Sequence, residues 1–232
     1  MKAPILFVFL GIISAQPLVH ASVISIPNSS FELPAVNVQD YSTPSNWTLT
    51  ENVTGTGRTY NNSIKNPAVK PAGMDGAQFT AIYLDNNDSD ALTPDLALSA
   101  ALTSANLGTL TAETNYSLTA AFAGTNNGSP RTYGLAILAN GVSVAEQTFN
   151  TNTLNGDGSF LDKTISFDTT AQPALVGQNL SVRLLYTSTY SFGRELFMDN
   201  VRLTAVPEPS AMAFIFGTAT LLSVWLRRRV SK

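Results

Sequence analysis

Hydrophobic and polar residues alternate along most of the middle of the chain. The segment 115–122 (NYSLTAAF) has an apolar residue at every second position, and the segments 163–168 and 179–188 show the same period. A period of two is typical of a strand that buries one face. Between two further segments of this kind stands the dipeptide Asn140-Gly141, which predicts a two-residue hairpin turn.

We therefore expect an all-β domain of roughly eight or nine strands over residues 22–205, folded as a single antiparallel β-sandwich. The region 93–107 is ambiguous, because it is rich in alanine and leucine and has Pro94 where a first helical turn accepts proline. It is either a short helix or an irregular edge strand. No internal repeat and no change of composition divides this part of the chain, which predicts one domain.

The start of the chain has the organisation of a signal peptide. Lys2 supplies the positive charge, an apolar run covers residues 5–13, and Val19-His20-Ala21 has the small residues that signal peptidase accepts around a cleavage site. We predict that residues 1–21 are removed after Ala21. The alternative is a buried N-terminal helix.

The end of the chain is compositionally different as well. Residues 211–226 carry no charge and precede Arg227, Arg228 and Arg229. As a helix they would extend roughly 24 Å, slightly less than a hydrocarbon core of about 30 Å. We predict a transmembrane helix here with the arginines on the cytoplasmic side. A core helix with a basic end is the alternative.

A short segment with two prolines precedes this span. A Pro-Glu-Pro element, an apolar helix and an arginine cluster at the C-terminus closely resemble the PEP-CTERM sorting signal of Gram-negative bacteria. The resemblance covers residues 206–232 and implies that an exosortase, a membrane-embedded cysteine peptidase, recognises and processes the tail. The protein would pass through the inner membrane and then reach the cell surface or the extracellular medium. The residues of the predicted signal are Val206, Pro207, Glu208 and Pro209, with Arg227, Arg228 and Arg229.

Charge and residue types exclude several functions of the middle region. Between Ser22 and Ala205 there are eight basic and fifteen acidic residues, a net charge of −7, against −3 for the whole chain. Such a region has no basic surface for nucleic acid. The chain has no cysteine, and its single histidine is His20, inside the predicted signal peptide. A thiol nucleophile, a disulfide, a histidine-dependent serine triad and a histidine–zinc site are therefore excluded.

Four short segments resemble motifs of one superfamily. Asn-x-x-Phe-Glu in 26–32 and Asp-Asn-Val in 196–203 are similar to the first and last strands of jelly-roll carbohydrate-binding modules, the galactose-binding-like domains. The segment 44–47 looks like the Pro-x-Gly-Trp element, with Asn46 where glycine is usual, and 73–78 looks like the Asp-Gly turn before a buried strand. Their order matches and they span the domain. The resemblance implies a jelly roll.

In that superfamily a calcium ion commonly joins the first and last strands. Carried over to this chain, the resemblance implies Glu32 and Asp199 as side-chain ligands, with carbonyls near Asn28, Ser30 and Asp75. The chemistry is reasonable, because calcium prefers six to eight oxygen ligands. The alternative is that Glu32 is a solvated charge at a strand end and that Asp199 accepts hydrogen bonds from a turn.

Aromatic residues are candidates for a sugar-binding platform, since rings stack on the apolar faces of pyranoses. Most such rings instead pair inside a core, and Trp47 is expected there because of its motif. The candidate ligand-binding residues are Tyr60, Tyr133, Tyr190 and Phe192.

Together these features favour a protein without catalytic residues, which binds extracellular polysaccharide or is a structural component of the extracellular polymer. The alternative is an enzyme that uses carboxylates alone, since some relatives with the calcium jelly roll are cyclases of indole alkaloid biosynthesis. Such an enzyme would be a glycoside hydrolase, with two carboxylates about 5–9.5 Å apart, or a cyclase with one acid in an apolar pocket. Asp199, Glu195 and Asp75 are its first candidates.

Overall fold

The structure is a computed structural model, and it describes most of the middle of the chain. Residues 21–207 form one compact unit. Side chains at 58–61, 85–86 and 194 are not described. The described backbone covers residues 20–52, 58–86, 98–124, 131–155, 157–188 and 194–208.

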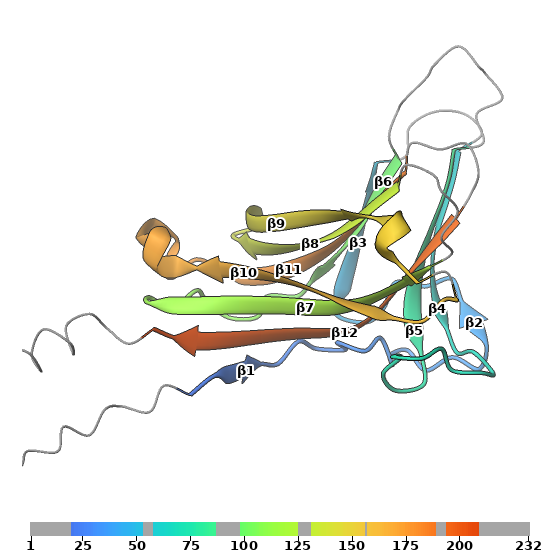
Figure 1. Cartoon of the computed structure of the whole chain (residues 1–232), viewed down its shortest axis with the longest axis horizontal. Coiled ribbons are helices and arrows are strands. Elements are labelled where there is room, and N and C mark those ends of the chain that lie inside the picture. Colours follow the sequence, from blue (N-terminus) through green and yellow to red (C-terminus); the bar gives the residue numbers. More distant parts are fainter. Residues whose placement is uncertain are drawn as a thin grey trace, which may run out of the picture. The chain divides into compact units, whose positions relative to one another are not determined.

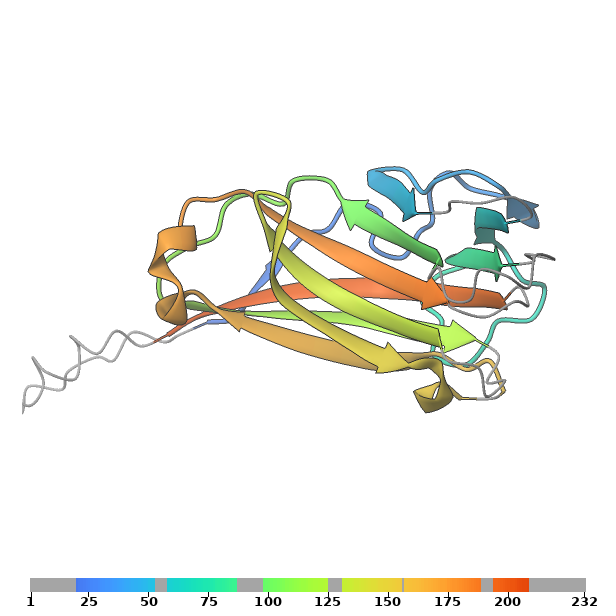
Figure 2. The same cartoon turned by 90° about the horizontal axis from the view of Figure 1, so that it is seen from above.

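Two antiparallel sheets form a β-sandwich, and they stack as two layers (Figures 1 and 2). In the larger sheet the strands lie in the order β10-β7-β12-β5-β4-β2, with β1 paired to the last residues of β12. Its strands are β1 (Ser22–Ile24), β2 (Gln39–Asp40), β4 (Arg58–Lys65), β5 (Phe79–Asn86), β7 (Thr114–Gly124), β10 (Leu161–Asp168) and β12 (Arg194–Pro207).

The smaller sheet has the order β3-β6-β11-β8-β9. Its strands are β3 (Trp47–Asn52), β6 (Leu98–Ser104), β8 (Arg131–Ala139), β9 (Val142–Asn150) and β11 (Leu180–Ser188). Three 3-10 turns follow β9 and β10: η1 (Thr151–Thr153), η2 (Thr169–Ala171) and η3 (Pro173–Leu175). The all-β antiparallel sandwich is confirmed, with no α-helix among the described residues.

The helix considered for the region 93–107 is wrong where the structure describes it. Residues 98–104 form strand β6, and their side chains alternate between buried and half-buried positions. Leu98, Ala100 and Leu102 share the buried face, and the strand pairs with β3 on one side and β11 on the other, which outweighs the helical composition of the run.

The core lies between the sheets and consists of the residues that the alternating pattern predicts. In β7 the side chains of Tyr116, Leu118, Ala120 and Phe122 are all buried, and the matching residues of β11 face them from the other sheet. Trp47 is also in the core, as expected from its motif, and its Nε1 donates to the carbonyl of Asn28 at 3.1 Å.

The predicted hairpin turn is confirmed. Asn140 and Gly141 connect β8 and β9 with φ angles of 48° and 81°. Two successive positive φ angles define a turn whose twist matches that of paired strands, and they explain why asparagine and glycine occupy it.

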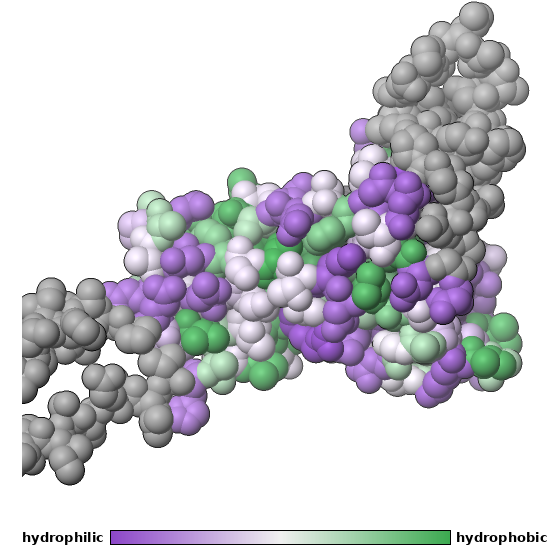
Figure 3. Space-filling model, in the orientation of Figure 1, coloured by the Kyte–Doolittle hydropathy of each residue, from purple (hydrophilic) through white to green (hydrophobic). Residues whose placement is uncertain are grey.

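Except for residues 20–21 and 206–208, the predicted terminal segments 1–21 and 206–232 lie outside the described residues. Within the described part no helix is long and apolar enough to cross a membrane. β12 continues through Val206 and Pro207, which pair with Asn115 and Thr114. On the coloured face in Figure 3, hydrophobic residues form small separate patches among hydrophilic ones.

The two faces of β7 give a direct test of the fold. Leu118→Ala should lower the free energy of unfolding by about 2–5 kcal/mol, because Leu118 is fully buried and its loss leaves a cavity. Thr119→Ala, one position along on the opposite face, should cost less than about 1 kcal/mol, since it removes only an exposed hydrogen bond to Thr164. Urea denaturation measures both, and equal losses would contradict the assignment of faces.

Candidate functional site

The first half of β12 presents chemically different side chains on its two faces. Leu196 and Met198 are buried in the core between the sheets. Glu195, Phe197 and Asp199 point to the opposite face of the larger sheet, because side chains alternate along a strand. That face has a small apolar cluster of its own, here called the outer cluster, which comprises Phe79, Ala81, Ala121, Ala123 and Phe160 with Met74 and Phe197 packed against it.

The outer cluster is covered in part by the segments that precede β5 and β10. The amide of Phe160 donates to the carbonyl of Ala72 at 2.8 Å and so joins the two segments. The ring of Phe79 lies 5.6 Å from that of Phe160 and 4.9 Å from that of Phe197, measured between ring centroids. Aromatic rings therefore gather around the middle of β12.

Lys65 and Glu195 form an ion pair at one edge of these rings. The ammonium of Lys65 donates to both carboxylate oxygens of Glu195 at 2.5 Å. The two side chains are 20% and 30% exposed, so the pair is accessible without being fully solvated. The Nζ atom of Lys65 also lies 5.4 Å from the centre of the Phe197 ring, within the range of a cation–π interaction. Tyr83 lies opposite Glu195 on β5.

Two positions further along the same face, Asp199 is fully buried. Its carboxylate accepts hydrogen bonds from the backbone amides of Asp75 and Asn200, both at 2.7 Å. A β-bulge follows Asp199, where Asn200 has a φ of 49° and the register with β7 shifts. The bulge lets the Asn200 amide turn back onto the Asp199 side chain.

Two more carboxylates adjoin Asp199. Glu32 accepts from the amides of Ala77 and Gln78 at 2.7 and 2.9 Å, and Ser30 Oγ donates to Asp75 at 2.7 Å. We call Ser30, Glu32, Asp75 and Asp199 the acidic cradle. A side chain at Gly76 would collide with Oε1 of Glu32, and Gly76 has a φ of 64°, so the turn requires glycine.

Burial raises the pKa of Asp199 to about 7, and the charges of Asp75 and Glu32 add to the shift. The backbone hydrogen bonds from Asp75 and Asn200 act in the opposite direction but are outweighed by desolvation. The cradle therefore places the buried carboxylate of Asp199 next to the half-buried Glu32 and the exposed Asp75, which favours binding of either a proton or a cation.

The structure brings together four of the five residues for which the resemblance implied metal binding. Asn28 forms its hydrogen bonds with other residues. Its side chain bonds to the backbone of Leu33 and Ser45, and its carbonyl accepts from Phe31 and Trp47. The described residues contain no group of three or more His, Cys, Asp or Glu side chains that meets the distance requirements of a metal centre.

The aromatic candidates are not gathered in one place that the structure describes. Tyr133 is fully buried, its hydroxyl is 2.8 Å from Oγ1 of Thr153, and its ring packs against Phe122 and Phe149. It is therefore not available as a surface platform. Tyr190 and Phe192 lie outside the described residues, as does the side chain of Tyr60.

The sorting-signal residues are only partly described. Val206 and Pro207 belong to β12, and Glu208 follows them; Pro209 and the three arginines are outside the described residues.

Lys65 is the residue of this face that the sequence did not indicate. It is one of eight bases in the middle region, and nothing in its neighbourhood marks it. The alternation of Glu195, Phe197 and Asp199 is visible in the sequence and signals that these side chains share a face.

The comparisons with known proteins give the family. A family model described as HpiC1-like, HpiC1 cyclase, matches residues 22–204. The chain belongs to the HpiC1-like cyclase family. A search of curated proteins finds no match.

Solved structures agree with this membership. A cyclase from Fischerella sp. TAU is 25% identical with a TM-score of 0.62, and the match covers 82% of this chain and 99% of that one. The Stig cyclase Fisc from the same organism, in complex with (3Z)-3-(1-methyl-2-pyrrolidinylidene)-3H-indole, is 25% identical with a TM-score of 0.61, covering 82% and 100%.

The expectation of a protein without catalytic activity is therefore wrong. The HpiC1-like cyclase family and the matching cyclase structures indicate an enzyme. The absence of cysteine and of any histidine other than His20 excludes particular chemistries, but it leaves carboxylate chemistry open. The findings favour the cyclase alternative over the polysaccharide-binding function.

The acidic cradle predicts an unusual dependence of stability on pH. An unperturbed aspartate has a pKa of 3.8, whereas burial raises the pKa of Asp199 to about 7 in the folded protein. When the pKa of a group is higher in the folded than in the unfolded state, the group contributes stability. This contribution is fully present below the unfolded-state pKa and is lost as the pH rises through the folded-state pKa. With a chelator present, the free energy of unfolding should fall by up to about 4 kcal/mol between pH 4 and pH 8.

Denaturant unfolding across this pH range checks the expectation. Asp199→Asn, which does not ionise, should be less stable at pH 4 and should show a much flatter profile. A wild-type profile as flat as that of the variant would contradict the raised pKa.

Proposed function

We propose that this member of the HpiC1-like cyclase family cyclises an electron-rich aromatic substrate of the indole class beside Glu195. Three observations support the proposal: the family membership, the indole bound to a structural neighbour of 25% identity, and the chemistry of the outer face. The observation that carries it is the ion pair of Glu195 and Lys65 at the edge of an aromatic cluster.

The aromatic cluster would bind and orient the substrate. The half-buried ring of Phe197 lies next to the ion pair, and the buried ring of Phe79 packs against it. Ala81 and Ala123 lie opposite Phe197 on the two neighbouring strands. A flat heteroaromatic ring gains offset or edge-to-face contacts with such rings. Positioning of this kind brings the reacting carbons together and reduces the entropic part of the barrier.

Glu195 would move the proton. In an electrophilic cyclisation a carbon of the ring forms a bond to an electron-poor carbon of its own side chain, and the ring then loses a proton. The carboxylate of Glu195 accepts that proton, and its bond to Lys65 fixes the orientation of both oxygens. The electron pair displaced from the electron-poor carbon goes to the atom that was doubly bonded to it, and the proton taken from the ring is returned to that atom, so that product and substrate are isomers.

We further propose that the acidic cradle binds calcium. Its donors are carboxylate, hydroxyl and carbonyl oxygens, the ligands that calcium prefers. One oxygen of Glu32 and one of Asp75 accept no hydrogen bond from the described residues, and the buried Asp199 needs a compensating charge. When bound, the ion neutralises the carboxylates and ties the turn before β5 to β12. Along the strand the cradle is about 13 Å from Glu195.

We also propose that the protein is exported and that its sandwich is a jelly roll of the galactose-binding-like type. The signal-peptide pattern of residues 1–21 and the resemblance of 206–232 to a sorting signal support export. The pairing of β1 with β12 and the nearness of the segments 26–32 and 73–78 support the jelly roll.

Replacing the proposed proton acceptor separates binding from reaction. Glu195→Gln should retain binding of (3Z)-3-(1-methyl-2-pyrrolidinylidene)-3H-indole, followed by fluorescence quenching, because the aromatic cluster is unchanged. Turnover of indoles that carry an electrophilic side chain, followed as a product of unchanged mass with a new retention time, should fall about 100-fold or more. Glu146→Gln, an exposed change on β9, is the matched control and should retain activity.

Two results would overturn the proposal for this site. One is wild-type protein that neither binds the indole nor converts any member of the series. The other is Glu195→Gln with unchanged turnover, which would place the reaction elsewhere.

Calcium should raise the thermal midpoint of the full chain by several degrees, since a ligand that binds only the folded state stabilises it. Glu32→Gln and Asp199→Asn should abolish most of this rise, whereas Asp162→Asn, on the outer surface of β10, should leave it unchanged. Differential scanning fluorimetry with calcium, magnesium or a chelator measures it. An identical midpoint with calcium and with chelator would refute the calcium site.

A further inference from the structure

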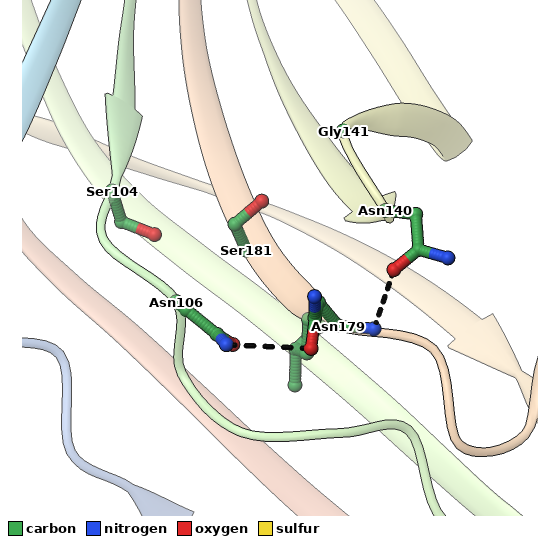
Figure 4. A pocket seen from close by; sticks show the side chains of 7 residues that line it. Ser104, Asn106, Asn140, Gly141, Asn179 and Ser181 are labelled. Carbon is green, nitrogen blue, oxygen red and sulfur yellow. Dashed lines mark hydrogen bonds between the residues drawn. The ribbon is translucent and has the colours of Figure 1, made fainter.

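A second site lies at one end of the smaller sheet. It is a hollow of about 270 Å3 at the meeting point of the end of β6, the β8–β9 turn and the start of β11 (Figure 4). Asparagine and serine side chains surround it: Ser104, Asn106, Asn140, Asn179 and Ser181, with Gly141 at the turn.

Backbone hydrogen bonds hold the walls of this hollow in place. The amide of Asn140 donates to the carbonyl of Asn179 at 2.8 Å, and the amide of Asn179 donates back to Oδ1 of Asn140 at 2.9 Å. The amide of Leu180 donates to the carbonyl of Gly108, and the amide of Leu107 donates to the carbonyl of Leu180, both at 2.8 Å. The side chains at the rim therefore start from fixed positions, which lowers the entropic cost of binding.

Several polar groups around the hollow retain capacity for a ligand. The Nδ2 groups of Asn140 and Asn179 donate to no acceptor in the part of the chain that the structure describes. Oδ1 of Asn179 receives only a long bond of 3.4 Å from Asn106. In Figure 4 Asn106 and Asn140 lie on either side of Asn179, which they contact through hydrogen bonds. The hydroxyl of Ser104 is already engaged, because it donates to the carbonyl of Ala105 and accepts from the amide of Val182. Amide groups offer a donor and an acceptor side by side.

The lining decides the chemical class of the ligand. No charged side chain lines the hollow, and the guanidinium of Arg183, which is not among the lining residues, donates to the carbonyl of Gly141 at 3.1 Å. An ionic ligand would therefore find no counter-charge. The one apolar lining residue, Leu180, is buried, so an aromatic ligand would find no surface to cover. A neutral compound with several hydroxyl groups matches the donors and acceptors that remain.

We propose that this hollow binds one ring of a neutral sugar. Its volume is near the lower end of small-molecule sites, which suits a single ring. The site is separate from Glu195, because Asn179 precedes β11 and Glu195 follows the other end of that strand, about 26 Å away along its nine residues. Without an aromatic platform the dissociation constant should be in the millimolar range.

Saturation-transfer NMR on the full chain tests the proposal with glucose, galactose, mannose and N-acetylglucosamine, each offered alone. At least one sugar should receive saturation from the wild-type protein. Asn179→Asp keeps the shape but removes the Nδ2 donor, and it should weaken binding about tenfold. Asn179→Ala should have a similar effect without adding a charge.

The control is Asn155→Asp, an exposed asparagine before β10, which should bind the sugar like the wild type. Thermal melting of each variant confirms that it is folded. Absence of saturation transfer from the wild type to all four sugars would overturn the proposal. Unchanged binding in Asn179→Ala would do so too, because the sugar would then bind elsewhere.

Discussion

The buried carboxylate of Asp199 joins parts of the chain that are far apart in sequence. It accepts a hydrogen bond from the backbone amide of Asp75, and Glu32 accepts a hydrogen bond from the backbone amide of Ala77 in the same turn. Three segments thereby meet at one point: the N-terminal loop, the turn before β5 and the last strand. Because these segments determine how β5 lies against β12, the position of Lys65 and Glu195 depends on this junction. The aromatic cluster beside them depends on it as well, since Phe79 begins β5 and Phe197 lies on β12.

Much of the fold follows from local pattern. Alternation in β7 and β11 identifies the buried faces, and the Asn140-Gly141 turn identifies the hairpin, because both signals depend on neighbouring residues. The region 98–104 was less predictable. Its composition suits a helix as well as a strand, and only pairing with β3 and β11 decides between them. A single sequence contains no direct information about that pairing.

The candidate site divides in the same way. Four residues of the acidic cradle were found from motif resemblance, although Asp75 and Asp199 are 124 positions apart. Lys65 was not found, because an ion pair between β4 and β12 depends on sheet order and not on any local motif. Tyr133 is a candidate for the sugar-binding platform in the sequence but is buried in the structure, where its hydroxyl is hydrogen-bonded to Thr153. The sequence does not favour enzymatic activity, because carboxylates are common and have no distinctive spacing.

The β-bulge after Asp199 has a consequence for how this strand can vary. The additional residue interrupts the alternation of side chains between the two faces of the sheet. β12 therefore has one row of alternating side chains before the bulge and a second row after it. The row before the bulge carries Glu195 and Phe197, and the row after it pairs with β1 through Leu203 and Ala205. Changes of chemistry in the first row leave the second row in register. Within one scaffold the residues of the first row can therefore diversify while the pairing of the first and last strands stays the same.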